Sequence, residues 1–183
     1  MPDLLTLPTW TKAGNVHVVV ETPRGARTKI KLDPELQAMI LWKPLILGLR
    51  FPYDFGFLPS THAEDGDPLD ALVIHEAATF PGIVIRCRPV GVVKVSQREK
   101  GEQKSVRNDR IIAIPEDDHR GKAIEDARQL SEEIKTELEK FFTASVALKD
   151  RDLEFLGWGG PEEAKRLIQD AERLCRDRQL HEG

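Results

Sequence analysis

The stretch IVIRCRPVGVVKV at residues 83–95 is the strongest strand signal in the chain. β-Branched residues fill it, and apolar and arginine side chains alternate along its first half, which is the period of a strand. Pro89 and Gly91 interrupt the alternation and predict a bulge or a sheet edge. Pro81 and Gly82 form a turn signal just before the stretch. We therefore expect a long strand that follows a turn and is irregular near its middle.

Further strands are predicted on either side, so the first two-thirds of the chain is expected to consist of strands and turns. These runs are short and rich in β-branched or alternating residues: 16–21, 29–32, 70–74 and 111–114. Residues 44–60 hold several Pro and Gly among aromatic and aliphatic residues, which indicates a structured loop with room for short strands. Residues 96–110 are almost wholly polar and are predicted to form a loop.

The last third of the chain is predicted to be helical. Apolar residues from Ile124 to Phe141 recur every three or four positions, which indicates an amphipathic helix with Ser131 on its solvated face. Gly and Pro at 157–161 interrupt the chain, and a second apolar stripe follows at 164–175. Short antiparallel strands that close on themselves predict an α+β fold. We expect a small closed, OB-like antiparallel β-barrel with helices packed outside, mainly from the C-terminal part.

Length and composition narrow the class of protein. The chain has 183 residues, which fits one domain spanning 1–183, and its 40% hydrophobic and 32% charged residues are typical of a globular protein. The net charge of −4 disfavours nucleic acid as a partner. No run reaches the ~18 apolar residues of a membrane span, and no signal peptide is visible, so no membrane partner is expected. Cys87 and Cys175 lack a paired spacing, which favours a reducing compartment and a cytoplasmic location.

An acidic segment, EDGDPLD at residues 64–70, carries the chemistry that the sequence predicts. Gly66 and Pro68 fix a turn within it, so the four carboxylates are held in place. Asp65 and Asp67 are two residues apart, and side chains at that spacing point the same way in an extended segment. Crowded carboxylates repel one another, and a divalent cation removes this cost. Oxygen ligands of this kind suit Mg²⁺ or Mn²⁺.

Two further kinds of structure compete for the acidic segment. A solvated acidic turn is the first, because runs of charge usually face water. An EF-hand calcium loop is the second, but it requires Gly at its sixth position. Counted from Asp65, the sixth position is Asp70. The sequence therefore favours a divalent-metal site over both.

The acidic segment resembles the signature of the soluble family I inorganic pyrophosphatases, and the likeness extends over roughly residues 16–170. Other segments that resemble motifs of this family are 18–23, 51–57, 81–91, 111–115 and Gly157-Trp158. Members of the family hydrolyse pyrophosphate to two phosphates with several Mg²⁺ ions and assemble as homo-oligomers. The resemblance therefore implies the same fold, pyrophosphate as substrate, Mg²⁺ (or Mn²⁺) as cofactor and a homo-oligomer.

The resemblance also implies roles for individual residues. Asp65 and Asp70 would hold the metal ions that flank the attacking water, and Asp67 would accept the proton of that water beside its part in the metal site. Glu21 would help to hold a further metal ion, and Lys29 would contact a substrate phosphate. Independently of the family, metal ions held close together activate and orient a water, and phosphoryl transfer then needs mainly positioning and charge neutralisation.

Lys43 and Arg110 are further cations expected to bind the substrate, although each departs from the family pattern. They stand where the family has an arginine and a lysine, respectively. The other departures are Lys31 for an acid, Phe55 for a tyrosine, Gln97 and Asn108 for two metal aspartates, and Ser145 and Val146 for a Tyr-Lys pair. Glu99 or Asp109 would replace the lost aspartates only if the 96–110 loop shifts.

One carboxylate cluster is thus intact and a second is eroded, which leaves three expectations open. The first is a pyrophosphatase whose activity is weakened or retuned. The second is a hydrolase of another small phosphoanhydride or phosphoester, and the third is a non-catalytic relative that binds pyrophosphate or metal. Each lost charged hydrogen bond costs roughly 1.5–3 kcal/mol, and about 1.4 kcal/mol changes a rate tenfold. Several such losses would lower turnover by orders of magnitude.

Overall fold

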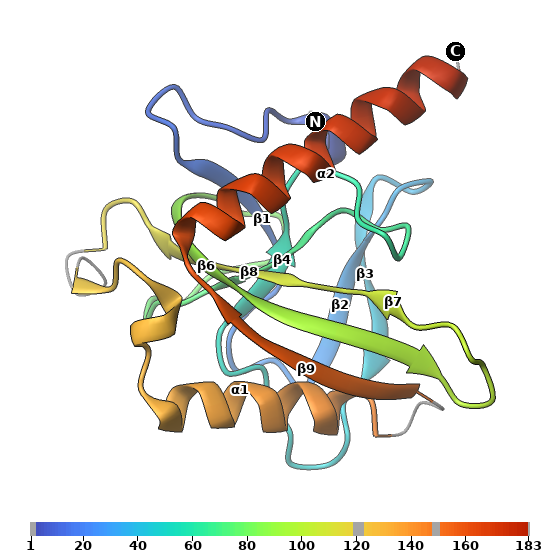
Figure 1. Ribbon diagram of the computed structural model, residues 1–183, viewed down its shortest axis with the longest axis vertical. Helices are drawn as coiled ribbons and strands as arrows, with labels where there is room; N and C mark the ends of the chain where they lie inside the picture. The colour runs from blue at the N-terminus through green and yellow to red at the C-terminus, as the bar shows by residue number, and fades with distance from the viewer. Residues whose placement is uncertain (1–2, 119–122, 148–150, 183) are drawn as a thin grey trace.

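The computed structural model describes residues 3–118, 123–147 and 151–182 (Figure 1). Its elements in chain order are η1 (Leu4–Thr6), β1 (Val16–Thr22), β2 (Thr28–Asp33), β3 (Ala38–Pro44), β4 (Asp54–Phe57), β5 (Asp70–Val73), β6 (Val84–Glu99), β7 (Val106–Arg107), β8 (Arg110–Pro115), η3 (Ala127–Gln129), α1 (Glu132–Ser145), β9 (Arg151–Gly159) and α2 (Pro161–Glu182). The protein is therefore a mixed, sheet-dominated fold with two long helices, as the predicted α+β class requires. The described part of the chain contains no helix that is long and apolar enough to cross a membrane.

The larger sheet joins its strands in the order β1-β4-β5-β8-β6-β7, with β9 paired to β6 and β1 paired to β6 as well. The strands β2 and β3 form a separate two-stranded hairpin. The prediction of a purely antiparallel sheet is wrong at one place, because β5 and β8 run parallel. A parallel pair needs a long crossover, and the chain between β5 and β8 supplies one that includes β6.

The long strand β6 contains the predicted irregularity, because its register with β8 shifts between Pro89 and Gly91. It also runs to Glu99, so the prediction of a loop over all of residues 96–110 is wrong. Each residue from Ser96 to Glu99 pairs with β9, and Arg151 of β9 donates to Glu99 at 2.7 Å. Polar side chains are compatible with a strand here because this end of the β6–β9 ribbon lies partly in solvent.

Two features of the predicted helical third differ in the structure. Residues 151–159 form strand β9 instead of leading into a helix. Helix α1 begins at Glu132 and not near Ile124, because Ser131 is its N-cap and accepts a hydrogen bond from the Ile134 amide at 3.3 Å. Such a cap satisfies an amide that the first turn leaves unpaired. The second helix starts at Pro161, as predicted, where the missing N–H costs nothing.

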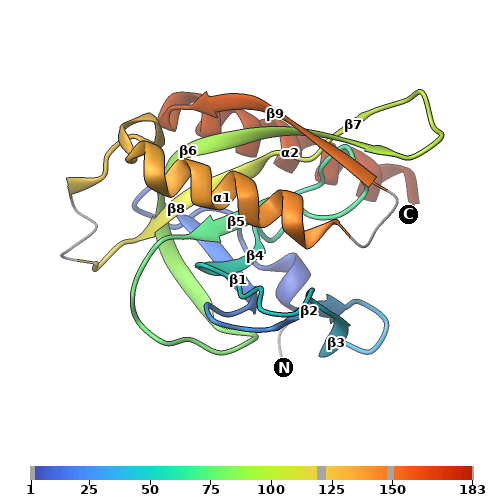
Figure 2. The ribbon, with the colours of Figure 1, turned by 90° about the horizontal axis from the view of Figure 1, so that it is seen from below.

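The two helices pack on different apolar clusters of the sheet. Ala164, Ile168 and Ala171 of α2 join a cluster with buried residues of β1, β5, β6 and β8. Leu138, Phe141 and Phe142 of α1 join the other cluster, which includes side chains of β4, β5, β6 and β8. Figures 1 and 2 show α1 and α2 on either side of the β6–β9 ribbon.

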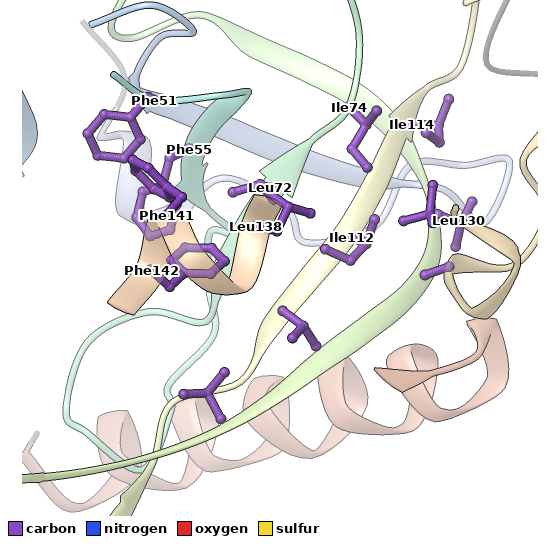
Figure 3. Packing of buried hydrophobic residues seen from close by; sticks show 14 residues of the cluster. Phe51, Phe55, Leu72, Ile74, Ile112, Ile114, Leu130, Leu138, Phe141 and Phe142 are labelled. Carbon is purple, nitrogen blue, oxygen red and sulfur yellow. The ribbon is translucent and has the colours of Figure 1, made fainter. Parts of the chain in front are cut away.

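Four phenylalanine rings gather where α1 meets β4 and the segment before it (Figure 3). The ring centroids of Phe51 and Phe141 are 5.0 Å apart, and those of Phe51 and Phe55 are 5.9 Å apart. Phe141 and Phe142 are 5.5 Å apart in an edge-on arrangement, which is a favoured geometry for aromatic pairs. We call this set the phenylalanine floor, because two of its rings lie beneath cations of the candidate site described below.

Candidate active site

The β2–β3 hairpin sets the direction of its basic side chains. Lys29 lies directly opposite Lys43 in the register, and directly opposed residues of an antiparallel pair share a face. Lys31 is two positions from Lys29 and shares that face too. The register shifts after Lys29, which leaves Trp42 as an extra residue in β3. Such a bulge redirects a side chain, and Trp42 lines the same cavity as Lys31.

The acidic turn is fixed by backbone hydrogen bonds at both ends. The Ala63 amide donates to the Asp67 carbonyl at 2.9 Å, and the Gly66 amide donates to the Ala63 carbonyl at 3.1 Å. Gly66 has a φ of 94°, which favours glycine at this position. The Leu69 amide donates to the buried Thr61 hydroxyl at 2.9 Å, so the chain enters β5 in one defined direction. Asp70 is the first residue of that strand.

The parallel pairing of β5 and β8 places Asp70 beside Arg110. The Arg110 Nε atom lies 4.0 Å from Asp70 Oδ2. The guanidinium of Arg110 also lies over the Phe142 ring, 4.4 Å from its centroid, and its Nη1 donates to the Asn108 carbonyl at 2.8 Å. Within the described residues, Nε of Arg110 is the buried side-chain nitrogen that has no hydrogen-bond partner. A buried donor that has no hydrogen-bond acceptor suits an anionic ligand.

Two adjoining cavities meet at Lys29 and Asp70, which line both. The first cavity has a volume of about 390 Å³ and also contacts Glu21, Lys31 and Asp67. We call it the carboxylate cavity. The second is small, about 80 Å³, and we call it the cationic cavity. Its other lining residues include Lys43, Phe55, Gln97, Asn108, Arg110, Ser145 and Val146.

The structure therefore brings the predicted substrate cations Lys29, Lys43 and Arg110 together around one cavity. Lys29 lies over the Phe55 ring, 5.0 Å from its centroid, so the phenylalanine floor supports this cation as it supports Arg110. Phe55 thus holds Lys29 by its ring and offers no hydroxyl to a ligand. The aliphatic Val146 lies in the same wall.

The predicted metal ligands divide into two sets. Glu21, Asp67 and Asp70 line the carboxylate cavity, whereas Asp65 is turned toward Asn108, whose Nδ2 donates to it at 2.8 Å. Asp65 Oδ1 also accepts from the Asp67 amide at 3.2 Å, while Asp67 Oδ2 pairs with Lys31 Nζ at 2.7 Å. Across residues 3–118, 123–147 and 151–182, no three acidic, histidine or cysteine side chains already form a metal-holding group.

Burial changes the protonation of the carboxylates in the site. Desolvation raises the pKa of Glu21 to about 7, against the opposing hydrogen bond from the Leu32 amide at 2.8 Å. Desolvation likewise raises the pKa of Asp70 to about 6, although Lys29 and Arg110 lower it. The pKa of Asp65 is also raised by desolvation. Buried carboxylates that sit near one another and resist ionisation are the donor set that a hard divalent cation stabilises, so these residues fit Mg²⁺.

Asp109 and Glu99, the two acids that could replace the lost metal aspartates, point elsewhere. Asp109 is buried, accepts from the Val95 amide at 2.9 Å and pairs with Arg107 at 2.7 Å. Glu99 pairs with Arg151 at 2.7 Å on the β6–β9 ribbon. Neither acid is among the described residues that line the two cavities, whereas Gln97 and Asn108 line the cationic one. The second acidic cluster is therefore not rebuilt from these neighbours.

Sequence reasoning identified Lys31 only as a departure from the family pattern and gave Trp42 no role. The structure places both in the carboxylate cavity, with Lys31 Nζ 5.9 Å from the centre of the Trp42 ring. The sequence held a signal for Lys31, because Lys29 and Lys31 are two positions apart along β2 and therefore share a face. The position of Trp42 depends on the bulge, which has no signature in the sequence of the hairpin.

Carboxylates that face lysines and an arginine across adjoining cavities are groups of the kind that bind metal ions and phosphate. Comparison with known proteins agrees with this class. The family profile for inorganic pyrophosphatase matches residues 18–176. The inorganic pyrophosphatase of Halobacterium salinarum is 37% identical over 160 residues, covering 87% of each chain. That of Thermus thermophilus is 37% identical over 176 residues, covering 96% of this chain and 97% of its own.

Solved structures lead to the same family. The crystal structure of the Thermus thermophilus inorganic pyrophosphatase superposes with a TM-score of 0.87 at 32% identity, covering 96% of this chain and 99% of that one. An inorganic pyrophosphatase from Neisseria gonorrhoeae gives a TM-score of 0.82 at 29% identity, covering 95% and 98%. This chain belongs to the inorganic pyrophosphatase family, which confirms the resemblance found in the sequence.

Proposed function

We propose that this protein hydrolyses inorganic pyrophosphate to two phosphates. The observation that carries the proposal is the contact between the two cavities, since Lys29 and Asp70 line both. One phosphoryl group in the cationic cavity would then lie directly beside the carboxylates. A catalyst for phosphoryl transfer needs mainly this kind of positioning and charge neutralisation.

Each residue of the site has a part in the proposed reaction. Lys29, Lys43 and Arg110 bind the substrate phosphates, and the Nε of Arg110, which has no hydrogen-bond partner in the described part of the chain, gains an acceptor from the anion. Asp67 accepts a proton from the attacking water. The water oxygen forms a bond to one phosphorus as the bond from that phosphorus to the bridging oxygen breaks, and the bridging oxygen leaves with the second phosphate.

We propose Mg²⁺ as the cofactor, with Mn²⁺ as an alternative. Glu21, Asp65, Asp67 and Asp70 would hold the ions, with small movements of Asp65 and Asp67 from their present partners. Bound Mg²⁺ would lower the pKa of the attacking water and offset the charge of the substrate.

The turnover is expected to be slow for this family. Lys43 presents a single ammonium where a guanidinium fork would bind two oxygens, and Phe55 and Val146 offer no side-chain hydrogen bond at all. Asn108 is neutral and already donates to Asp65. The site therefore keeps the charge that attracts pyrophosphate but has fewer directed contacts to the transition state.

The first test is phosphate release from pyrophosphate with and without Mg²⁺, on the purified chain and on Asp67→Asn. General-base catalysis contributes about 10²–10⁴ in rate, so the variant is expected to lose at least about 100-fold in kcat. The exposed Asp177→Asn on α2 is the matched control and keeps full activity. An Asp67→Asn protein as active as the parent would exclude Asp67 as the base.

A second candidate substrate is a phosphoanhydride that carries an organic group. The carboxylate cavity favours it, because Leu5, Ile40 and Trp42 form an apolar wall for which pyrophosphate has no use. A panel of organic diphosphates beside pyrophosphate, compared by kcat/KM, separates the two. Tight Mg²⁺-dependent binding of pyrophosphate without phosphate release would instead support a non-catalytic relative.

We also propose the finer architecture and surroundings of the molecule. Pairing of β1 with both β4 and β6 supports a closed, OB-like barrel, and the match over residues 18–176 supports a single domain across 1–183. Family membership supports a homo-oligomer, which light scattering on the purified protein would measure. The free thiols of Cys87 and Cys175 support a reducing, cytoplasmic location, which fractionation would test.

A further inference from the structure

Lys31 lies among the carboxylates of the site as a cation that belongs to the chain itself. Its Nζ is 2.7 Å from Asp67 Oδ2, which is a direct ion pair, and 5.9 Å from the centre of the Trp42 ring. Both neighbours hold the ammonium on the cavity side of the hairpin. With 29% of its side chain exposed, Lys31 is only partly accessible to water.

The charge of Lys31 reaches more than its direct partner. It acts electrostatically on Glu21 and Asp65 as well as on Asp67, and Asp70 acts on it in turn. A lysine ammonium is fully charged at neutral pH. One side chain therefore supplies positive charge to all four carboxylates that are proposed to hold metal ions.

A positive charge fixed in a metal site competes with the metal. Mg²⁺ gains its affinity from carboxylates whose charge is not yet neutralised, and a nearby ammonium both repels the ion and removes part of that charge. In addition, the Asp67 Oδ2 atom can bind a metal ion only after it gives up its ion pair with Lys31. Both effects weaken binding of Mg²⁺ on the Asp67 side of the cavity.

We propose that Lys31 is a built-in counter-cation of Glu21, Asp65, Asp67 and Asp70, and that its charge takes the place of one divalent ion in this site. The inference rests on the proposed function only in that these carboxylates bind Mg²⁺. Its consequence is that the protein binds fewer Mg²⁺ ions, or binds one of them more weakly, than the same carboxylates would without Lys31. Lys31 is in this sense a determinant of metal stoichiometry and not a catalytic residue.

The test measures Mg²⁺ binding by calorimetry and equilibrium dialysis in the absence of pyrophosphate. Lys31→Met removes the charge and keeps the approximate length of the side chain, whereas Lys31→Arg keeps the charge. Lys31→Met is expected to bind one additional Mg²⁺ per chain, or to bind Mg²⁺ about tenfold more tightly, as the interaction of nearby unit charges allows. Lys31→Arg is expected to match the parent, and so is Lys165→Met, which changes an exposed lysine on α2.

The outcomes separate this inference from the proposed activity. Equal Mg²⁺ binding by the parent and a folded Lys31→Met, judged by circular dichroism, overturns the inference even if pyrophosphate is hydrolysed. Equal gains in Lys31→Met and Lys31→Arg overturn it too, because the charge is then irrelevant. If Lys31→Met alone gains Mg²⁺ affinity while the parent releases no phosphate, the inference stands and the proposed activity fails. No Mg²⁺ binding by any of the proteins overturns both the inference and the metal ligands.

Discussion

Glu21 is buried, with 5% of its surface exposed. The free energy of unfolding therefore depends on whether its carboxyl group is protonated. Its pKa is raised by desolvation from the ordinary value of 4.5 to about 7. The native state therefore keeps a proton that the unfolded chain has already lost between these two values. Linkage then requires the free energy of unfolding to fall as pH rises through this window.

We predict that the titration of Glu21 alone lowers the free energy of unfolding of the metal-free protein by about 2–3 kcal/mol between pH 4.5 and pH 7, at 1.36 kcal/mol per pKa unit, and that Asp70 adds to this loss. Urea unfolding at a series of pH values measures it. Glu21→Gln imitates the protonated acid, keeps an acceptor for the Leu32 amide and is expected to flatten this part of the pH profile. An unchanged slope in the variant would assign the effect to other groups, Asp70 first, because its pKa is raised in the same direction.

The surroundings of Arg110 indicate that it binds an anionic ligand. Its guanidinium is held between the Phe142 ring and the Asn108 carbonyl, and its Nε lies 4.0 Å from Asp70 Oδ2 without a hydrogen-bond partner among the described residues. The sequence identified Arg110 by its alignment with a family lysine. The sequence did not indicate the ring beneath it, because Phe142 lies on α1, far along the chain.

At the scale of elements, the start of α1 depends on one hydroxyl. Ser131 caps the helix through the Ile134 amide, so Ser131→Ala is expected to lower the free energy of unfolding by about 0.5–2 kcal/mol. Ser131→Asp retains an acceptor at the cap and is the matched control, with stability close to the parent in denaturant titrations. Equal losses in both variants would show that the side chain acts there through something other than the cap.

The elements that sequence patterns predicted well are those with strong local signals, such as β5, β8, α2 and the central part of β6. Strand β9 was missed because Gly157 and Gly159 resemble a break, although its side chains alternate between partly buried and exposed. The end of β6 was missed because polar residues at 96–99 satisfy a strand only when β9 pairs with them. Local patterns cannot show a partner that lies so far along the chain.

At the scale of the molecule, the site is assembled from segments distant in sequence. Glu21 comes from β1, Lys29 from β2, Asp70 from β5 and Arg110 from β8. The sequence identified these four residues as candidates for the site, and the family resemblance implied a role for each. Their meeting depends on non-local strand pairing, including the parallel pair β5–β8, and the sequence alone did not supply this.

Because the site forms only when the whole sheet is paired, a ligand that binds it should stabilise the entire fold. A non-hydrolysable diphosphonate with Mg²⁺ is expected to raise the Tm, and at 100 times its Kd to add about 2.7 kcal/mol to the free energy of unfolding. Lys29→Met should reduce this shift, whereas Lys165→Met should not. A Tm that is the same with and without the diphosphonate would show that the cavities do not bind this chemical class.

Trp42 is the extra residue in the β2–β3 hairpin, so its indole can be removed without moving Lys29 and Lys43 out of register. Because Trp42 is the unmatched position, Leu41 stays across from Ile30 and Lys43 across from Lys29. A chain that lacked residue 42 would close the ladder with both of these pairs intact. A single in-frame codon deletion would therefore remove the Trp42 ring from the carboxylate cavity and leave Lys29 and Lys43 of the cationic cavity in register.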